Sequence, residues 1–101
     1  MLKAVFYKRD ESFSGFSFSG HAGYGIEGND IVCAAITSAV ELTCNTITEF
    51  FGADASVEVL ENEVRLTMNE ESVPARQLLE SLYLHIKNIA DEHSKIKLTI
   101  K

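Results

Sequence analysis

The segment that decides the predicted fold is residues 31–52, IVCAAITSAVELTCNTITEFFG. Apolar side chains recur there at helical spacing, Asn29 or Asp30 suits the N-cap and Gly52 suits the stop, so the pattern predicts one long helix. Apolar residues cover most of the helix circumference, which predicts that the helix is largely buried. Glu41 and several threonines interrupt the apolar run, and we therefore expect a core helix and no membrane-spanning segment.

On both sides of this helix, apolar and polar residues alternate as they do in half-buried strands. Residues 2–8 and 16–20 alternate around a polar turn at 9–12, which predicts a β-hairpin. Residues 57–59 and 64–68 alternate around a second polar turn and predict a second hairpin. The central helix thus connects two hairpins.

A second helix and a last strand complete the predicted order. Ser72 suits an N-cap, Pro74 suits the first helical turn, and residues 75–90 carry one apolar stripe. Residues 96–100 alternate again and predict a strand. The order ββαββαβ indicates an α+β fold with two helices packed on a mostly antiparallel sheet, and we expect residues 1–101 to form a single domain.

The excess of acidic over basic residues restricts the kinds of molecule that the protein can bind. Fifteen acidic and nine basic residues give a net charge of −6. This charge opposes direct binding to nucleic acid and favours encounter with a basic protein substrate. Residues 1–9 contain no apolar block of the kind that signal peptides carry, so we expect the protein to act in the cytoplasm.

The chain has two cysteines, Cys33 and Cys44. On one helix they stand about 16 Å apart at 1.5 Å per residue, too far for a disulfide, so we expect both to remain thiols. Packing among apolar neighbours explains Cys44. Cys33 differs because it falls in the first helical turn, where the positive end of the helix dipole stabilises a thiolate.

A histidine and a glycine-bearing loop precede Cys33. His21 lies twelve positions upstream, and the loop between the two carries Gly23, Gly25 and Gly28. Such a loop has the backbone freedom to bring the imidazole over the helix start. The pair has the composition of a Cys/His dyad, in which the thiolate attacks a carbonyl carbon and the imidazole protonates the leaving amine.

Other interpretations of these residues stay open. Cys33 among apolar neighbours is equally consistent with a small buried side chain, which favours a noncatalytic interaction protein. Asp30 suits either the helix N-cap or a role in orienting His21. Residues 23–28, GYGIEG, match the GxGxxG pattern of dinucleotide sites, but the preceding strand belongs to a hairpin and Asp30 would repel a pyrophosphate.

The remaining histidines do not indicate a metal site. His85 flanks the apolar stripe of the second helix, and His93 lies near the end of that helix, where the dipole favours it. No set of histidines and cysteines has zinc-ligand spacing. We therefore expect neither a metal nor another cofactor.

Residues 20–40, GHAGYGIEGNDIVCAAITSAV, resemble the signature of the ribosomal-processing cysteine proteases, in which GHA and DIVCA flank a short glycine-bearing loop. The predicted order of elements agrees with this family along the whole chain. The resemblance implies a cysteine endopeptidase whose dyad is His21 and Cys33. The family's aspartate falls on Asp30, and its hydroxyl residue falls on Thr37, where serine is more usual.

The resemblance also implies what the substrate and the oligomeric state are. Proteases of this family remove the short N-terminal extension of bacterial large-subunit ribosomal protein twenty-seven, cut after aromatic residues and form homodimers. We therefore expect a ribosomal protein precursor as the substrate and a homodimer as the assembly. The alternative function is that of a noncatalytic, ribosome-associated interaction protein.

Overall fold

The computed structural model describes residues 2–20 and 31–101. Its elements, in chain order, are β1 Leu2–Arg9, β2 Ser12–Gly20, α1 Ile31–Asn45, η1 Thr46–Phe50, β3 Ala55–Leu60, β4 Glu63–Met68, α2 Val73–Glu92 and β5 Ile96–Ile100. η1 is a short π-helix that continues α1. The predicted order ββαββαβ and the α+β class are confirmed.

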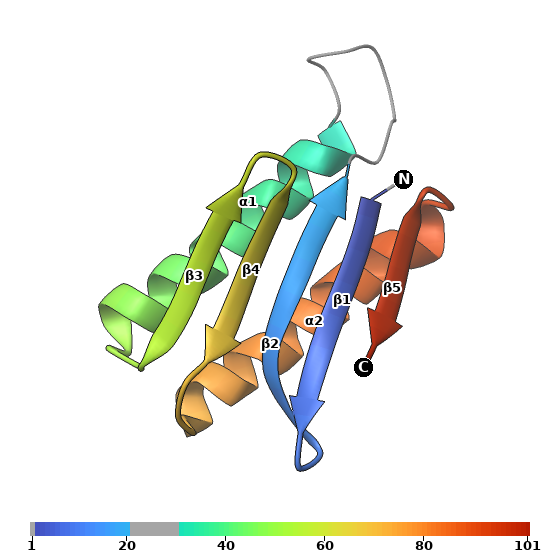
Figure 1. Ribbon diagram of the computed structural model, residues 1–101. Helices are drawn as coiled ribbons and strands as arrows, with labels where there is room; N and C mark the ends of the chain where they lie inside the picture. Colours follow the sequence, from blue (N-terminus) through green and yellow to red (C-terminus); the bar gives the residue numbers. More distant parts are fainter. Residues whose placement is uncertain (1, 21–30) are drawn as a thin grey trace.

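The strands form one five-stranded sheet in the order β3-β4-β2-β1-β5. β1 pairs with β2, β2 with β4 and β4 with β3, all antiparallel, whereas β5 runs parallel to β1. Both helices lie on one face of this sheet, α1 behind β3 and β4 and α2 behind β1 and β2 (Figure 1). The mostly antiparallel sheet of the prediction is confirmed, with one parallel pair at the β5 edge.

An aromatic cluster joins the first hairpin to α2. Phe6 is fully buried, and its ring contacts Phe13, Phe16 and Phe18 of β2 and Tyr83 of α2. The ring centroids lie between 5.3 and 6.0 Å from that of Phe6, in tilted or edge-to-face arrangements that aromatic pairs favour. Alternation places the rings of Phe6, Phe16 and Phe18 on the helix side of the sheet. Phe13 is out of step with this alternation, and the register shift between Tyr7 and Lys8 brings its ring to the same side.

Two turns and one close approach fix the path of the chain. Asp10 and Glu11 both have positive φ, so the first hairpin closes in a two-residue turn, shorter than the predicted one. Gly52 has a φ of 59° and ends the α1–η1 helix as predicted. A β-carbon on Gly15 would overlap the backbone oxygen of Leu66, so only glycine lets β2 pack against β4 at this position.

α2 forms as its sequence predicts. The Ser72 hydroxyl accepts a hydrogen bond from the backbone N–H of Ala75 at 3.3 Å, and Pro74 lies in the first turn. Four residues of the predicted stripe are buried against the sheet: Ala75, Leu79, Leu82 and Ile86. The helix therefore covers one half of the apolar face.

α1 departs from its prediction. Its buried side chains are Ile36, Val40, Thr43 and Cys44, whereas Leu42 is 68% exposed and Phe50 of η1 is 84% exposed. The prediction of a largely buried helix is wrong, because the sheet covers only one side of α1 and α2 does not reach its outer side. By length and composition alone, Ile31–Phe50 would suffice to cross a membrane, but its inner side packs into the core of the sheet.

Candidate active site

The described part of the chain contains a cleft of about 510 Å³ between α1 and the β3–β4 hairpin. This volume is typical of sites that bind small molecules or peptide segments. Cys33, Ile36 and Thr37 line it from α1, and Val57 and Val59 line it from β3. The cleft therefore combines the predicted nucleophile with an apolar wall.

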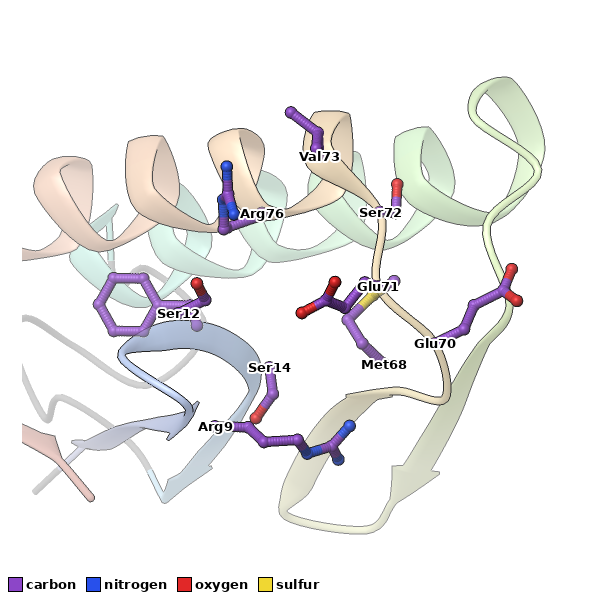
Figure 2. Close-up of a pocket in the computed structure, with 10 residues that line it drawn as sticks. Arg9, Ser12, Ser14, Met68, Glu70, Glu71, Ser72, Val73 and Arg76 are labelled. Carbon is purple, nitrogen blue, oxygen red and sulfur yellow. The ribbon is translucent and has the colours of Figure 1, made fainter.

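A second, smaller cavity lies at the start of α2. It has a volume of about 60 Å³ and is bounded by the end of β1, the start of β2 and the start of α2. Figure 2 shows Arg9 and Arg76 around it together with Glu70 and Glu71. Its lining residues carry both positive and negative charges and include neither cysteine nor histidine. A cavity of this volume is also too small for a peptide segment. The cleft at Cys33 is the candidate active site.

Cys33 lies in the first turn of α1, as the sequence predicts, and the structure shows it partly buried. Ile36, one turn later, is buried in the core and anchors this end of the helix. Thr37 is exposed and lines the same cleft as Cys33. A thiol in this position faces the cleft at the helix end that favours negative charge.

Several predicted site residues fall outside the described residues. They are His21, Gly23, Gly25, Gly28 and Asp30. Gly20, the residue before His21 in the sequence, is the last residue of β2 and lines the cleft. The approach of His21 to Cys33 stays a prediction, as do the roles of Asp30 and of the glycine-bearing loop.

Cys44 also lines this cleft. Only 8% of the residue is exposed, and it packs in the hydrophobic core. Burial raises the pKa of the Cys44 thiol to about 11, and the negative charge of Glu41 contributes to the rise. Cys44 therefore stays protonated at neutral pH and is a packing residue, as its sequence context indicates.

Carboxylates surround the mouth of the cleft. Glu41 of α1, Glu61 of the β3–β4 turn and Glu63 of β4 are lining residues. Glu63 accepts hydrogen bonds from Arg65 and from the Ser17 hydroxyl, and these bonds lower the pKa of its carboxyl. Within the described residues, Glu41 and Glu61 form no ion pair, so their charges face the cleft uncompensated.

No local sequence pattern predicts these carboxylates as site residues. They come from three elements that only the tertiary fold brings together, and a glutamate on an exposed helix face or in a polar turn carries no local signal of a site. Val57 and Val59 likewise show only strand alternation in the sequence, and the fold makes them a wall of the cleft. The position of Cys33 is predictable from the sequence, whereas the residues that line the cleft with it are brought together only by the fold.

The other histidines lie away from this cleft. His85 is exposed on α2, and the backbone N–H of His93 donates to the carbonyl of Ala90 at the end of that helix. Among residues 2–20 and 31–101, no three side chains of the His, Cys, Asp and Glu types form a group that could hold a metal ion.

The family model of the cysteine protease Prp matches residues 1–97. The chain belongs to the cysteine protease Prp family. This assignment agrees with the resemblance seen at residues 20–40 and with a cysteine at the cleft. The chain is accordingly a cysteine-type peptidase. No curated protein matches it in sequence.

Solved structures have the same fold over the whole chain. The ribosomal processing protease Prp of Staphylococcus aureus with a covalently linked product peptide is 21% identical, with a TM-score of 0.93 and full coverage of both chains. The same protease with a substrate peptide is 20% identical with a TM-score of 0.87, again with full coverage of both chains. A Streptococcus mutans protein is 23% identical with a TM-score of 0.83, covering 100% of this chain and 96% of the other. At these identities the likeness establishes the fold.

Proposed function

We propose that this Prp-family protease is an endopeptidase that removes the N-terminal extension of large-subunit ribosomal protein twenty-seven, with Cys33 as nucleophile and His21 as its base. The observation that carries the proposal is the position of Cys33, in the first turn of α1 and on the wall of the cleft. A cysteine at this place lines a cleft that a peptide can enter and lies beside the backbone N–H groups of the helix start.

The proposed chemistry needs two proton-handling side chains and one helix end. The imidazole of His21 takes the Cys33 proton, and the Sγ attacks the carbonyl carbon of the scissile peptide bond. Backbone N–H groups at the start of α1 stabilise the oxyanion of the tetrahedral intermediate. His21 then protonates the leaving amine, and a water molecule hydrolyses the thioester to release the new carboxyl end and restore the thiol.

Two further residues are proposed to support the dyad. Thr37 lies one turn after Cys33 and lines the cleft, and we propose that its hydroxyl bonds a peptide carbonyl near the scissile bond. Asp30 is proposed to orient the imidazole of His21 or to cap the helix.

The proposed substrate has support from charge and from the similar structures. The S. aureus protein is described as a ribosomal processing protease, and ribosomal proteins are basic because they bind RNA. The net charge of −6 and the uncompensated Glu41 and Glu61 at the cleft favour such a substrate. We propose that this processing takes place in the cytoplasm.

The proposed function is tested with the host's own full-length ribosomal protein twenty-seven. Parent, Cys33→Ala, His21→Ala and Cys44→Ala proteins are incubated with it, and mass spectrometry identifies any new N-terminus. We expect the parent and Cys44→Ala to cleave and the other two to lose at least about 10³-fold in rate. Cleavage by Cys33→Ala at the parent rate would refute the mechanism, and no cleavage by the parent would refute this substrate.

We also propose that the protease is a homodimer. The exposed side of α1 and η1 supports this, because Leu42 and Phe50 are large apolar side chains in water. In analytical ultracentrifugation the parent is expected at twice its 11.2 kDa mass, and Leu42→Glu is expected to shift it toward the monomer. Leu84→Glu, at an exposed position of α2, is the matched control. A monomeric parent would contradict the proposal.

A further inference from the structure

β3 is the outermost strand of the sheet beside the cleft, and within the described residues it pairs only with β4. Its register with β4 is continuous from Ala55 to Leu60. The backbone N–H of Asn69 donates to the carbonyl of Asp54 at 2.9 Å, and these two residues are opposite each other in the same register. This bond fixes which backbone groups of β3 point outward.

In an antiparallel ladder, residues alternate between those that bond the partner strand and those whose backbone groups point away from it. Because Asp54 bonds β4, every second residue after it does the same, up to Leu60. The backbone N–H and C=O groups of Ala55, Val57 and Val59 therefore point away from β4, toward the open edge.

This edge lacks the features that usually prevent pairing with other chains. β3 reads ASVEVL, without lysine, proline or bulge, whereas Lys97 lies within β5 at the opposite edge of the sheet. Val59 is 75% exposed and Val57 is 38% exposed. β3 has one charged side chain, the exposed Glu58. An edge without lysine, proline or bulge is a surface to which an extended chain, above all a basic one, adds readily.

The edge is continuous with the candidate active site. Val57 and Val59 pair with Leu66 and Val64 of β4, and cross-strand partners point to the same face of a sheet. Leu66 is in the core beneath the helices, so Val57 and Val59 face the helix side and line the cleft together with Cys33. The same residues that open their backbone to the edge therefore line the cleft that contains the proposed nucleophile.

We propose that the protease binds its substrate as an extended segment that adds to the free edge of β3, with backbone hydrogen bonds to Ala55, Val57 and Val59. Alternate side chains of the segment point into the cleft and the others point to solvent. The inference rests on the proposed function and assigns the residues that hold the peptide for cleavage. A peptide that runs parallel or antiparallel to β3 can form hydrogen bonds with the outward backbone groups of these residues.

Charge favours a basic peptide over a second copy of the chain at this edge. Glu41 and Glu61 at the cleft attract a cationic segment. A second copy brings a net charge of −6 and its own Glu58 in β3, and it would cover the wall that a substrate must reach. The occupant is therefore an unfolded basic segment rather than another β3.

Proline at position 59 tests this arrangement with a matched control. Val59→Pro removes one outward N–H while leaving the bonds between β3 and β4, and proline is tolerated at such edge positions. Val59→Ala removes the same side chain but keeps the N–H. With a peptide spanning the cleavage site of ribosomal protein twenty-seven, we expect kcat/KM to fall about tenfold for Val59→Pro and less than about threefold for Val59→Ala. Equal values for two variants of equal Tm would overturn the proposal.

Amide hydrogen exchange provides a measurement that does not depend on the proline variant folding. In the Cys33→Ala protein, the N–H groups of Val57 and Val59 are expected to exchange at least about tenfold more slowly once the uncut peptide is bound. Cleavage by the parent without this protection would overturn the inference and leave the proposed function standing. If exchange at Val57 and Val59 slows with rising protein concentration in the absence of peptide, a second copy of the chain occupies the edge and the proposal is overturned. If the parent does not cut the peptide, the proposed substrate fails and the inference falls with it.

Discussion

Cys33 and Cys44 line one cleft from the same helix, Cys33 in its first turn and Cys44 near its last residue. They are eleven residues apart, which separates them by about three turns. Cys33 is partly buried, whereas Cys44 is 8% exposed and belongs to the core. The same helix therefore carries the proposed nucleophile and a thiol that packs in the core.

This difference predicts selective alkylation. With iodoacetamide at pH 7.5, Cys33 of the folded protein is expected to be modified and Cys44 to remain unmodified, because burial raises the pKa of Cys44 to about 11 and blocks the reagent. Peptide mapping by mass spectrometry reads both sites. In concentrated urea both are expected to react. Modification of Cys44 in the native protein as fast as in urea would contradict the assigned burial.

The raised pKa of Cys44 also predicts a loss of stability in alkali. In the unfolded chain this thiol ionises near its ordinary pKa of 9.0, whereas in the folded protein it keeps its proton up to about 11. Between these two values the unfolded state loses the proton first, so the free energy of unfolding falls as pH rises, by up to ~2 kcal/mol. Well below pH 9 both states hold the proton and the effect is absent.

Cys44→Ala isolates this contribution. Tyrosines and lysines also titrate in alkali, so the measurement is the difference between parent and variant in urea denaturation at pH 8 and pH 10.5. The variant starts from a lower stability because it leaves a small cavity, but its free energy of unfolding is expected to fall less steeply with pH. Parallel pH dependences for the two proteins would rule out a buried, protonated Cys44.

Local patterns in the sequence predict most of this fold. Ser72 and Pro74 mark the start of α2 because capping and first-turn chemistry depend only on near neighbours. Strand alternation likewise predicts the hairpins, since each strand has one buried face. The position of Cys33 in a first helical turn is a local property of the same kind, and the structure agrees with it.

Properties that depend on distant parts of the chain were not predictable. The apolar residues of α1 do not tell which side faces the sheet, and Leu42 is exposed because no described element covers it. The parallel pairing of β5 with β1 depends on which edge of the sheet α2 returns to. Glu41 and Glu61 meet at the cleft only after the hairpin of β3 and β4 folds beside α1.

These carboxylates predict a charge-dependent KM. For a basic precursor peptide, Glu41→Gln is expected to raise KM about three- to fivefold at low ionic strength with little change in kcat, because it removes an attractive charge beside the bound segment. The effect is expected to shrink in 0.5 M salt. Glu80→Gln, at an exposed position of α2, changes the net charge equally and serves as the control. An equal rise in KM for both variants would assign the effect to net charge alone.

Gly15 predicts a position where the sheet tolerates no side chain. A β-carbon there would overlap the backbone oxygen of Leu66 in β4, and a backbone atom within a ladder cannot move aside as a flexible side chain does. Gly15→Ala is therefore expected to lower the free energy of unfolding by ~2 kcal/mol or more. Gly52→Ala is the matched control, since its φ of 59° costs ~1 kcal/mol but a β-carbon there meets no atom within 4 Å. Urea denaturation of both variants gives the comparison, and a Gly15→Ala protein at least as stable as Gly52→Ala would show that β2 and β4 do not approach as closely as described.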